Sequence, residues 1–118
     1  MADTLYIKRN DLQPYYLAQA RDSDDAVIDL TGATIVFTMK VYNSDGTTGT
    51  VKVSRQSVSI TDATNGKCEY RWASADTDTA GNYIVEFEVT PASGGKFTIP
   101  NPRYGKALVT VEADLDST

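Results

Sequence analysis

The sequence predicts an all-β fold in which two antiparallel sheets are stacked on each other. Apolar residues alternate with polar ones in several short runs, which is the pattern of a strand with one buried face. Turns rich in Gly and Asn separate the runs, and helical periodicity is nearly absent. In residues 76–89 an Asp-Thr-Ala-Gly segment leads into Tyr83, which opens another alternating strand. A Tyr at this place bonds upstream backbone in immunoglobulin-like sandwiches, so we expect that architecture, with about seven to nine strands.

The first predicted elements lie in residues 5–21, as one or two edge strands. Pro14 interrupts this stretch, and proline has no N–H to donate to the interior of a sheet. Residues 26–30 form a short segment, which the Thr31-Gly32 pair separates from a strand beginning near Thr34. The pattern of residues 15–20 does not decide which of their faces is buried.

Five later segments each keep one face apolar. Their inward residues are expected to be Ile35, Phe37, Met39 and Val41; Val51 and Val53 with Val58 and Ile60; Cys68, Tyr70 and Trp72; Tyr83, Val85, Phe87 and Val89; and Val109 and Val111. Such faces are buried when two sheets pack against each other. The core is expected to contain Phe37, Met39, Trp72, Val85 and Phe87.

The connections between these segments contain residues typical of turns. Residues 43–46, 65–66 and 92–95 supply Gly and Asn, which adopt positive φ at little steric cost. Residues 74–80 lack a strand pattern and are expected to cross between the sheets as one helical turn. In this crossing we expect Asp76 and Asp78 to accept hydrogen bonds from backbone N–H groups. We expect the Tyr83 hydroxyl to bond backbone near Asp78 or Thr79.

Length and composition describe a globular protein. The chain has 118 residues, of which 41% are hydrophobic and 23% are charged. We expect residues 1–118 to form one domain, with residues 113–118 as a loose tail. No segment approaches the ~20 apolar residues of a membrane helix, and the N-terminus lacks the pattern of a signal peptide. One cysteine, Cys68, excludes an intramolecular disulfide and predicts synthesis in a reducing cytoplasm.

Charge and residue types exclude several classes of function. The net charge is −5, and the 11 basic residues are scattered among 16 acidic ones, whereas a nucleic-acid surface needs them clustered. The sequence has no histidine, the commonest general base and neutral metal ligand. Cys68 lies in mid-strand among apolar neighbours and is expected to be an inert, buried thiol. No Gly-x-Ser-x-Gly nucleophile motif occurs.

Carboxylates are the remaining candidates for chemistry. Glu86 and Glu88 point outward from one strand, as on a solvated sheet face. Residues 22–25 form an acidic loop near Asp29, and its oxygen atoms suit calcium, but it lacks the Gly and the bidentate Glu of an EF-hand. Solvated turn carboxylates explain this loop better. We therefore predict no catalytic residue, no cofactor and no metal site.

Aromatic residues offer a different kind of surface. Trp72 falls on the inward face by alternation, which favours core packing over a platform for sugar rings. Tyr6, Tyr15, Tyr42 and Tyr104 are less clearly inward, and aromatic side chains are enriched at protein interfaces. Interface and plain surface remain open for these four residues.

An ordered set of motifs resembles a known family. The motifs are Asp29-Leu30-Thr31-Gly32-Ala33-Thr34, Val36-Phe37-Thr38-Met39, Gly66 with Tyr70 and Trp72, Asp78-Thr79-Ala80-Gly81-Asn82-Tyr83, Glu86-Phe87-Glu88-Val89-Thr90 and Gly95-Lys96-Phe97-Thr98-Ile99-Pro100. In this order they are similar to the N-terminal domain of phage baseplate upper proteins, a small immunoglobulin-like domain of tailed-phage virions. The resemblance covers roughly residues 12–113.

This resemblance implies a non-enzymatic structural protein of a tailed-phage virion, in the tail tip or baseplate. It implies contacts with other virion proteins and with copies of itself, and synthesis in the cytoplasm of the bacterial host. The composition adds that neither nucleic acid nor membrane is a partner. The alternatives are a capsid-decorating, neck or head-fibre protein and, from another class, a carbohydrate-binding module for host attachment.

Two segments are predicted to contact other subunits. Pro100 and Pro102 limit regular pairing, so residues 97–104 are expected to form a protruding extended arm. An edge strand in residues 5–16 offers unpaired backbone groups to a neighbour. The predicted contact residues are Tyr6, Tyr15, Tyr16, Asn101, Pro102, Arg103 and Tyr104. An ordinary surface loop is the alternative for the segment from 101 to 105.

Overall fold

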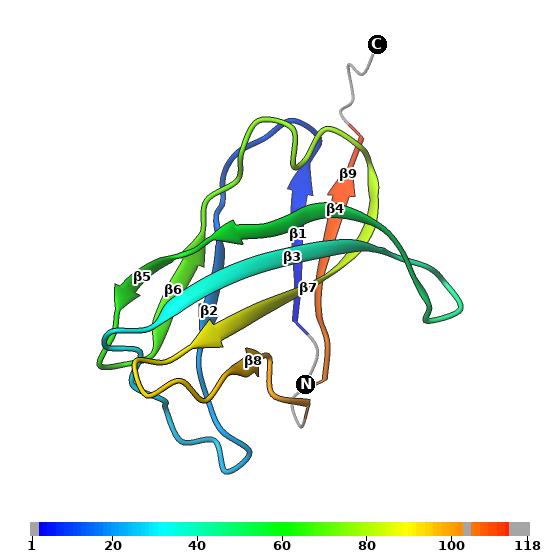
Figure 1. The fold of residues 1–118 in the computed structure, drawn as a ribbon. Coiled ribbons are helices and arrows are strands. Elements are labelled where there is room, and N and C mark those ends of the chain that lie inside the picture. Colours follow the sequence, from blue (N-terminus) through cyan, green and yellow to red (C-terminus); the bar gives the residue numbers. More distant parts are fainter. Residues whose placement is uncertain (1–2, 103–104, 114–118) are drawn as a thin grey trace.

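The computed structural model describes residues 3–102 and 105–113, and in these residues it contains nine strands and no α-helix. The strands are β1 (Asp3–Lys8), β2 (Tyr16–Gln19), β3 (Thr34–Tyr42), β4 (Thr48–Ser57), β5 (Ser59–Asp62), β6 (Lys67–Tyr70), β7 (Gly81–Thr90), β8 (Phe97–Ile99) and β9 (Ala107–Glu112). The larger sheet has the order β1-β9-β7-β3-β4, with β8 also on β7, and the smaller sheet has the order β2-β6-β5 (Figure 1). The predicted immunoglobulin-like β-sandwich is confirmed.

The core lies between the two sheets and is rich in aromatic rings. Phe37 of β3 and Tyr70 of β6 stack across the sandwich with their ring centroids 4.0 Å apart. Phe87 and Trp72 approach the Phe37 ring edge-on at 5.1 and 5.7 Å. Alternation places these side chains on inner faces, and stacking the sheets removes them from water. The fully buried side chains include Phe37, Met39, Val85, Phe87, Val89, Val109 and Val111.

One strand pair differs from the expected antiparallel arrangement, because β1 pairs with β9 in parallel. Parallel neighbours need a long crossover connection. Here the crossover consists of all seven strands from β2 to β8. The first and last strands of the described chain therefore lie side by side (Figure 1).

The run of residues 51–60 changes sheets, which the alternation did not reveal. β4 belongs to the larger sheet and β5 to the smaller one, and only Val58 separates them. Register shifts interrupt the pairing of β3 with β4, and Val51 lies opposite Lys40 while Val53 lies opposite Met39. Val53 is buried, but Val51 is 46% exposed, so the expectation that both face the core is wrong for Val51.

The segment predicted to be a free arm is partly a strand. β8 pairs with β7, with Phe97 opposite Val89 and Ile99 opposite Phe87. Its backbone is held by this ladder and the Ile99 side chain is buried. The prediction of a protruding arm is therefore wrong for residues 97–99. The prolines that follow end the strand at Ile99 and do not prevent the pairing before them.

Candidate interaction surface

The crossing from β6 to β7 is held by Tyr83. The Tyr83 hydroxyl donates a hydrogen bond to the Thr79 carbonyl at 2.6 Å. Asp78 pairs with the Lys52 ammonium group of β4 and also accepts the Thr79 hydroxyl at 2.9 Å. The Lys52 hydrogen bond, followed by that of Thr79, lowers the pKa of the Asp78 carboxyl. The crossing is thus tied to β7 through Tyr83 and to β4 through Lys52, and it is a turn without α-helix.

Two buried polar residues anchor the same crossing. Asp76 accepts hydrogen bonds from the Ala73 N–H at 2.9 Å and from the Tyr70 hydroxyl. Burial, followed by the hydrogen bond to Asp76, raises the pKa of Tyr70. The Thr77 hydroxyl donates to the Asp11 carbonyl at 2.9 Å, which joins the crossing to the chain between β1 and β2. The sequence pattern gave no signal for Thr77, because its partner is far away along the chain.

Two of the side chains considered for chemistry, Cys68 and Glu88, have surroundings or partners within the fold. Cys68 is buried, and burial raises the pKa of its thiol to about 11, so the thiolate is scarce at neutral pH. Glu88 forms ion pairs with Arg55 at 3.0 Å and Lys96 at 3.7 Å on the outer face of the larger sheet. Glu86 is exposed on the same face.

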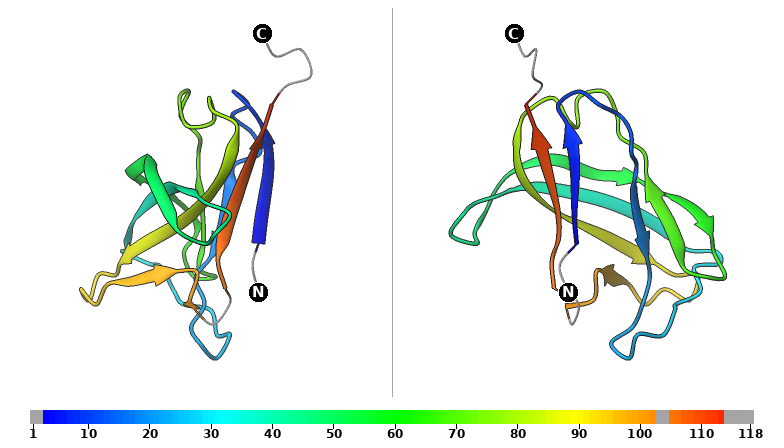
Figure 2. Two further views of the ribbon diagram at one scale, coloured as in Figure 1. Left: turned by 90° about the vertical axis from the view of Figure 1, so that its right-hand side faces the viewer. Right: turned by 180° about the vertical axis from the view of Figure 1, so that it is seen from behind.

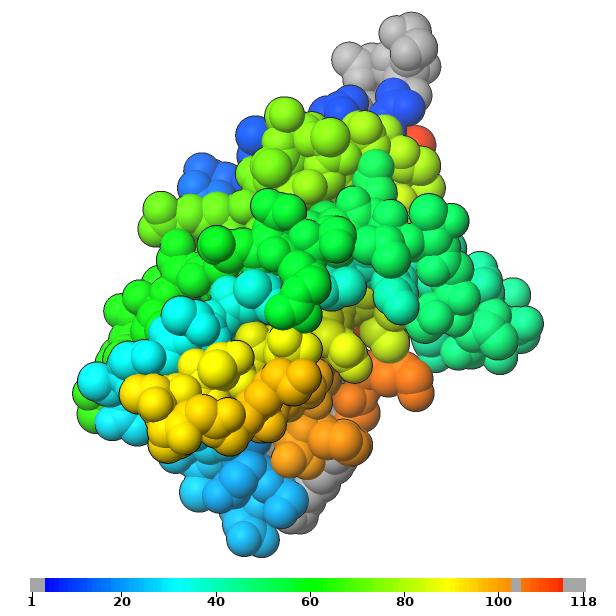
Figure 3. Space-filling model, in the orientation of Figure 1, coloured from blue at the N-terminus to red at the C-terminus, as the bar shows by residue number. Residues whose placement is uncertain are grey.

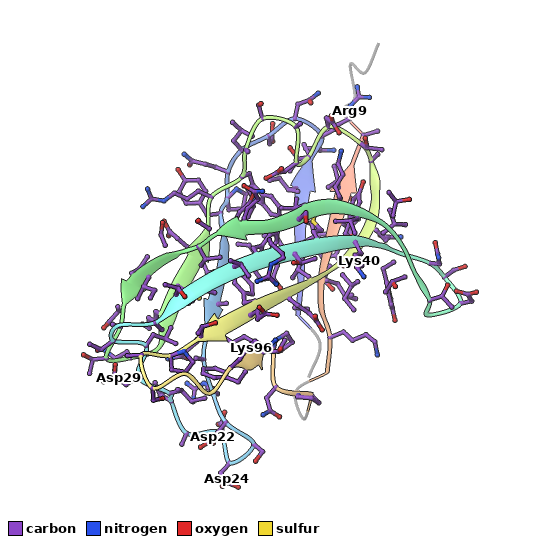
Figure 4. All side chains as sticks on the ribbon, in the orientation of Figure 1. Arg9, Asp22, Asp24, Asp29, Lys40 and Lys96 are labelled. Atoms are coloured by element: carbon purple, nitrogen blue, oxygen red, sulfur yellow. The ribbon has the colours of Figure 1, made fainter. Side chains whose placement is uncertain are left out.

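The acidic loop does not gather its carboxylates around one point. Asp22 accepts the backbone N–H groups of Asp24 at 2.9 Å and Ala26 at 3.0 Å, as in a turn. Figure 4 shows Asp22 and Asp24 on the loop after β2 and Asp29 well apart from them. In the part of the chain that the structure describes, no three His, Cys, Asp or Glu side chains are placed to hold a metal ion.

The predicted contact residues have different environments. Tyr6 is 64% exposed on β1, and Pro102 is exposed as well. Tyr15 is half-buried, with the Arg71 guanidinium 5.6 Å from its ring centroid. Tyr16 is only 6% exposed, and its ring lies 5.7 Å from that of Phe87. The side chain of Tyr16 therefore belongs to the core, because β2 turns this face toward the larger sheet.

The structure brings some of these residues together. Asn101 is half-buried and lines a hollow of about 250 Å³ with Tyr16, while Leu17, 71% exposed, lies at its rim. The start of β1 lies beside the start of β9, where Asp3 pairs with Ala107. Arg103 and Tyr104 lie outside the described residues. The N-terminal strand and the chain before β9 therefore share one side of the molecule (Figure 2).

Among the free strand edges of the described residues, that of β1 is the most regular. The Arg9 N–H donates to the Glu112 carbonyl at 2.7 Å, so the N–H of Arg9 points toward β9. Because the backbone groups of successive residues in a strand point to opposite edges, those of Thr4 and Tyr6 point away from β9. β1 has six residues with no proline and no register shift, and its charged residues, Asp3 and Lys8, are only the two at its ends. Short length, bulges, prolines and charges are the usual protection of an edge against pairing with another chain.

The other free edges carry that protection. β4 contains register shifts, the charged residues Lys52 and Arg55, and a positive φ of 48° at Arg55. β2 and β5 have four residues each, and β8 has three. In the back view of Figure 2, β1 and β2 run next to each other, yet they belong to different sheets and are not paired. The outer edge of β1 is thus open for a strand from another molecule.

Comparison with known proteins finds a match to one protein family. A family model described as the BppU N-terminal domain matches residues 20–102. No curated protein matches the chain. A crystal structure of CopC from Methylosinus trichosporium OB3b is similar, with 13% identity and a TM-score of 0.46, over 98% of this chain and 90% of that chain. The described residues contain no helix that is long and apolar enough to cross a membrane.

Proposed function

Because this chain belongs to the BppU N-terminal domain family, the family of a phage baseplate structural protein, we propose that it is a non-enzymatic building block of the tail tip or baseplate. It acts by contacts with other virion proteins and with further copies of itself. The family match covers residues 20–102, well over half of the chain. The protein is made in the cytoplasm of the bacterial host, where its single cysteine stays a thiol.

The open edge of β1 is the observation that carries the proposed contacts. An unpaired edge supplies N–H and C=O groups in the register that a strand of a neighbour requires. The outward-directed backbone of Thr4 and Tyr6 gives this edge its donors and acceptors. Asn101 and Pro102, at the end of the larger sheet where β1 begins, extend the same contact surface. Tyr15 with Leu17 offers apolar area at the edge of the smaller sheet.

Hydrogen–deuterium exchange of the isolated chain and of purified phage particles tests this proposal. In the particle, a peptide covering β1 is expected to exchange more slowly, because new backbone hydrogen bonds protect the Thr4 and Tyr6 amides. The turn at residues 92–95 serves as the control, since it is exposed and lies away from β1.

Two results would contradict different parts of the proposal. If mass spectrometry of purified particles does not find the chain, the assignment to the virion is wrong. If the chain is present but β1 exchanges at the same rate in both samples, the virion assignment stands and the edge contact is wrong.

A further inference from the structure

A row of four residues crosses the outer face of the larger sheet, and we propose that it forms a binding site for a neutral sugar. Tyr6 of β1 lies opposite Thr110 of β9, and Thr110 lies opposite Asn82 of β7. The pairing of β3 with β7 ends at Val41 opposite Tyr83, and Tyr42 is the next residue of β3. Tyr42 and Asn82 line the same hollow. Two tyrosines therefore stand at the ends of the row, with two small polar residues between them.

The row forms the base of an open trough. Neighbouring strands are ~4.8 Å apart, so three strand spacings separate Tyr6 from Tyr42 by about 14 Å. The hollow between them has a volume of about 340 Å³, which is within the ~300–1,000 Å³ of small-molecule sites. The β3–β4 hairpin projects from the body of the molecule, as Figure 2 (right) and Figure 3 show. Asn43 of this hairpin contributes to one wall.

The polar groups in the trough are all uncharged. None of its ten described lining residues is acidic or basic, although 27 of the 118 residues of the chain (11 basic and 16 acidic) are charged. Thr110 donates its hydroxyl to the Asn82 side-chain oxygen at 3.0 Å, which leaves the Asn82 NH₂ group directed elsewhere as a donor. Asn43 donates to the Thr47 hydroxyl at 3.0 Å and keeps its side-chain oxygen as an acceptor.

This combination fits a sugar better than a peptide side chain. A sugar ring presents hydroxyl groups that both donate and accept, together with a C–H face that can lie on a phenol ring. An apolar side chain placed on Thr110 and Asn82 would remove them from water without offering hydrogen bonds, which costs free energy. An interface anchor instead needs an apolar pocket. The missing charges point to a neutral glycoside rather than an acidic sugar.

The trough and the open edge of β1 do not compete. In a strand the backbone groups lie in the plane of the sheet and the side chains stand perpendicular to it. The backbone of Tyr6 therefore faces the free edge, while its ring borders the trough. The sugar site does not rest on the proposed assembly contact, and it can be measured with the isolated chain.

Saturation-transfer difference NMR tests the site with a panel of neutral sugars. The probes are methyl α-D-glucopyranoside, methyl β-D-galactopyranoside, methyl α-L-rhamnopyranoside and N-acetyl-D-glucosamine, each at millimolar concentration. We expect saturation transfer to the ring protons of at least one probe. At least one of Tyr6→Ala and Tyr42→Ala is expected to weaken the affinity roughly two- to tenfold, because it removes the ring on which the sugar stacks. Tyr15→Ala is the matched control, since Tyr15 lies next to the smaller sheet.

A second variant separates binding from folding. Thr110→Val keeps the shape of a β-branched side chain but releases the Asn82 amide, so it is expected to weaken binding while the dispersed NMR spectrum of the folded chain is retained. The proposal is overturned if no probe receives saturation, or if transfer is the same in the tyrosine variants as in the unchanged chain. If the trough is protected in phage particles but binds no probe, it is a protein contact instead.

Discussion

Single substitutions measure how much individual contacts at the corner before β7 contribute to the free energy of unfolding. Tyr83→Phe removes the hydroxyl that donates to the Thr79 carbonyl and leaves the buried ring in place. We expect the free energy of unfolding to fall by about 1 kcal/mol, the net value of one partly buried hydrogen bond. Urea denaturation measures it, with Tyr6→Phe as the control, because the exposed Tyr6 donates to no group of the corner. Equal stability of Tyr83→Phe and the unchanged chain would contradict the structural role of the corner.

Gly66 shows how one residue without a side chain permits a close approach. Its φ is +68°, and a Cβ atom there would lie 2.6 Å from the Ile28 carbonyl oxygen. Gly66→Ala is expected to lower the free energy of unfolding by more than the ~1–2 kcal/mol cost of left-handed backbone alone. Gly46→Ala is the matched control, because Gly46 has a φ of +88° and no atom near the added Cβ. Thermal or urea unfolding of both variants isolates the cost of the contact with the Ile28 carbonyl oxygen. An equal loss of stability in both variants would show that this contact costs nothing.

Among the elements, strands with one buried face could be predicted from the sequence. The inward residues of β3, β6, β7 and β9 follow strict alternation, because each strand lies with one face on the core and one in water. Tyr83 could be identified as a corner residue because its partner Thr79 is only four positions away.

Features that depend on distant partners could not be predicted in the same way. β8 pairs with β7, β1 pairs with β9 in parallel, and the chain changes sheets at Val58, but none of these pairings leaves a local pattern. The sequence does not decide the orientation of β2, because Tyr15, Tyr16 and Leu17 are all large and apolar. Only the packing against Phe87 selects Tyr16 as the buried residue. The trough likewise requires the register of four strands, which no local motif contains.

The edge strand β1 gives a prediction about proline. Thr4→Pro removes an N–H that points to the free edge, so the ladder with β9 is kept and stability should change little. Leu5→Pro removes an N–H directed at β9 and should destabilise clearly, because proline inside a ladder forfeits its hydrogen bond. Urea denaturation compares the stability of the two variants.

In assembly, we expect Thr4→Pro to reduce incorporation into particles, while Thr4→Val, which keeps the N–H, does not.

This pair of substitutions is informative whatever the partner is. If Thr4→Pro destabilises as much as Leu5→Pro, the backbone groups of Thr4 do not face the free edge. If Thr4→Pro leaves both stability and incorporation unchanged, the edge is open but takes no part in assembly.

For the whole molecule, the division into two sheets separates three kinds of surface. The inner faces meet in the aromatic core around Phe37, the edge of β1 offers backbone groups, and the outer face of the larger sheet holds the uncharged trough. A sandwich allows this because side chains and backbone groups of one strand point in perpendicular directions. Contacts at the edge and on the outer face can therefore change without disturbing the core.

The stability of the whole molecule is expected to depend on acid pH through its turn carboxylates. Three of them have pKa values lowered by hydrogen bonds in the folded state: Asp29 through Thr31, Asp45 through Thr47, and Asp78 through Lys52. A carboxyl with a lowered folded pKa binds fewer protons in the folded than in the unfolded state. Its stabilisation is complete above the unfolded pKa of about 3.9 and is lost as the pH falls through the folded pKa.

We therefore expect the melting temperature measured by calorimetry to be nearly level from neutral pH down to about pH 5 and to decline below about pH 4. Because each of these carboxylates is solvent-exposed, each contribution is modest and the decline should be gradual. Asp45→Asn combined with Asp78→Asn removes two of the three titrating groups and should make the decline shallower. Glu86→Gln is the control, since Glu86 is exposed on the sheet face outside these turns. A melting temperature that rises as the solution is acidified below pH 4 would show that these hydrogen bonds do not favour the charged carboxylates in the folded state.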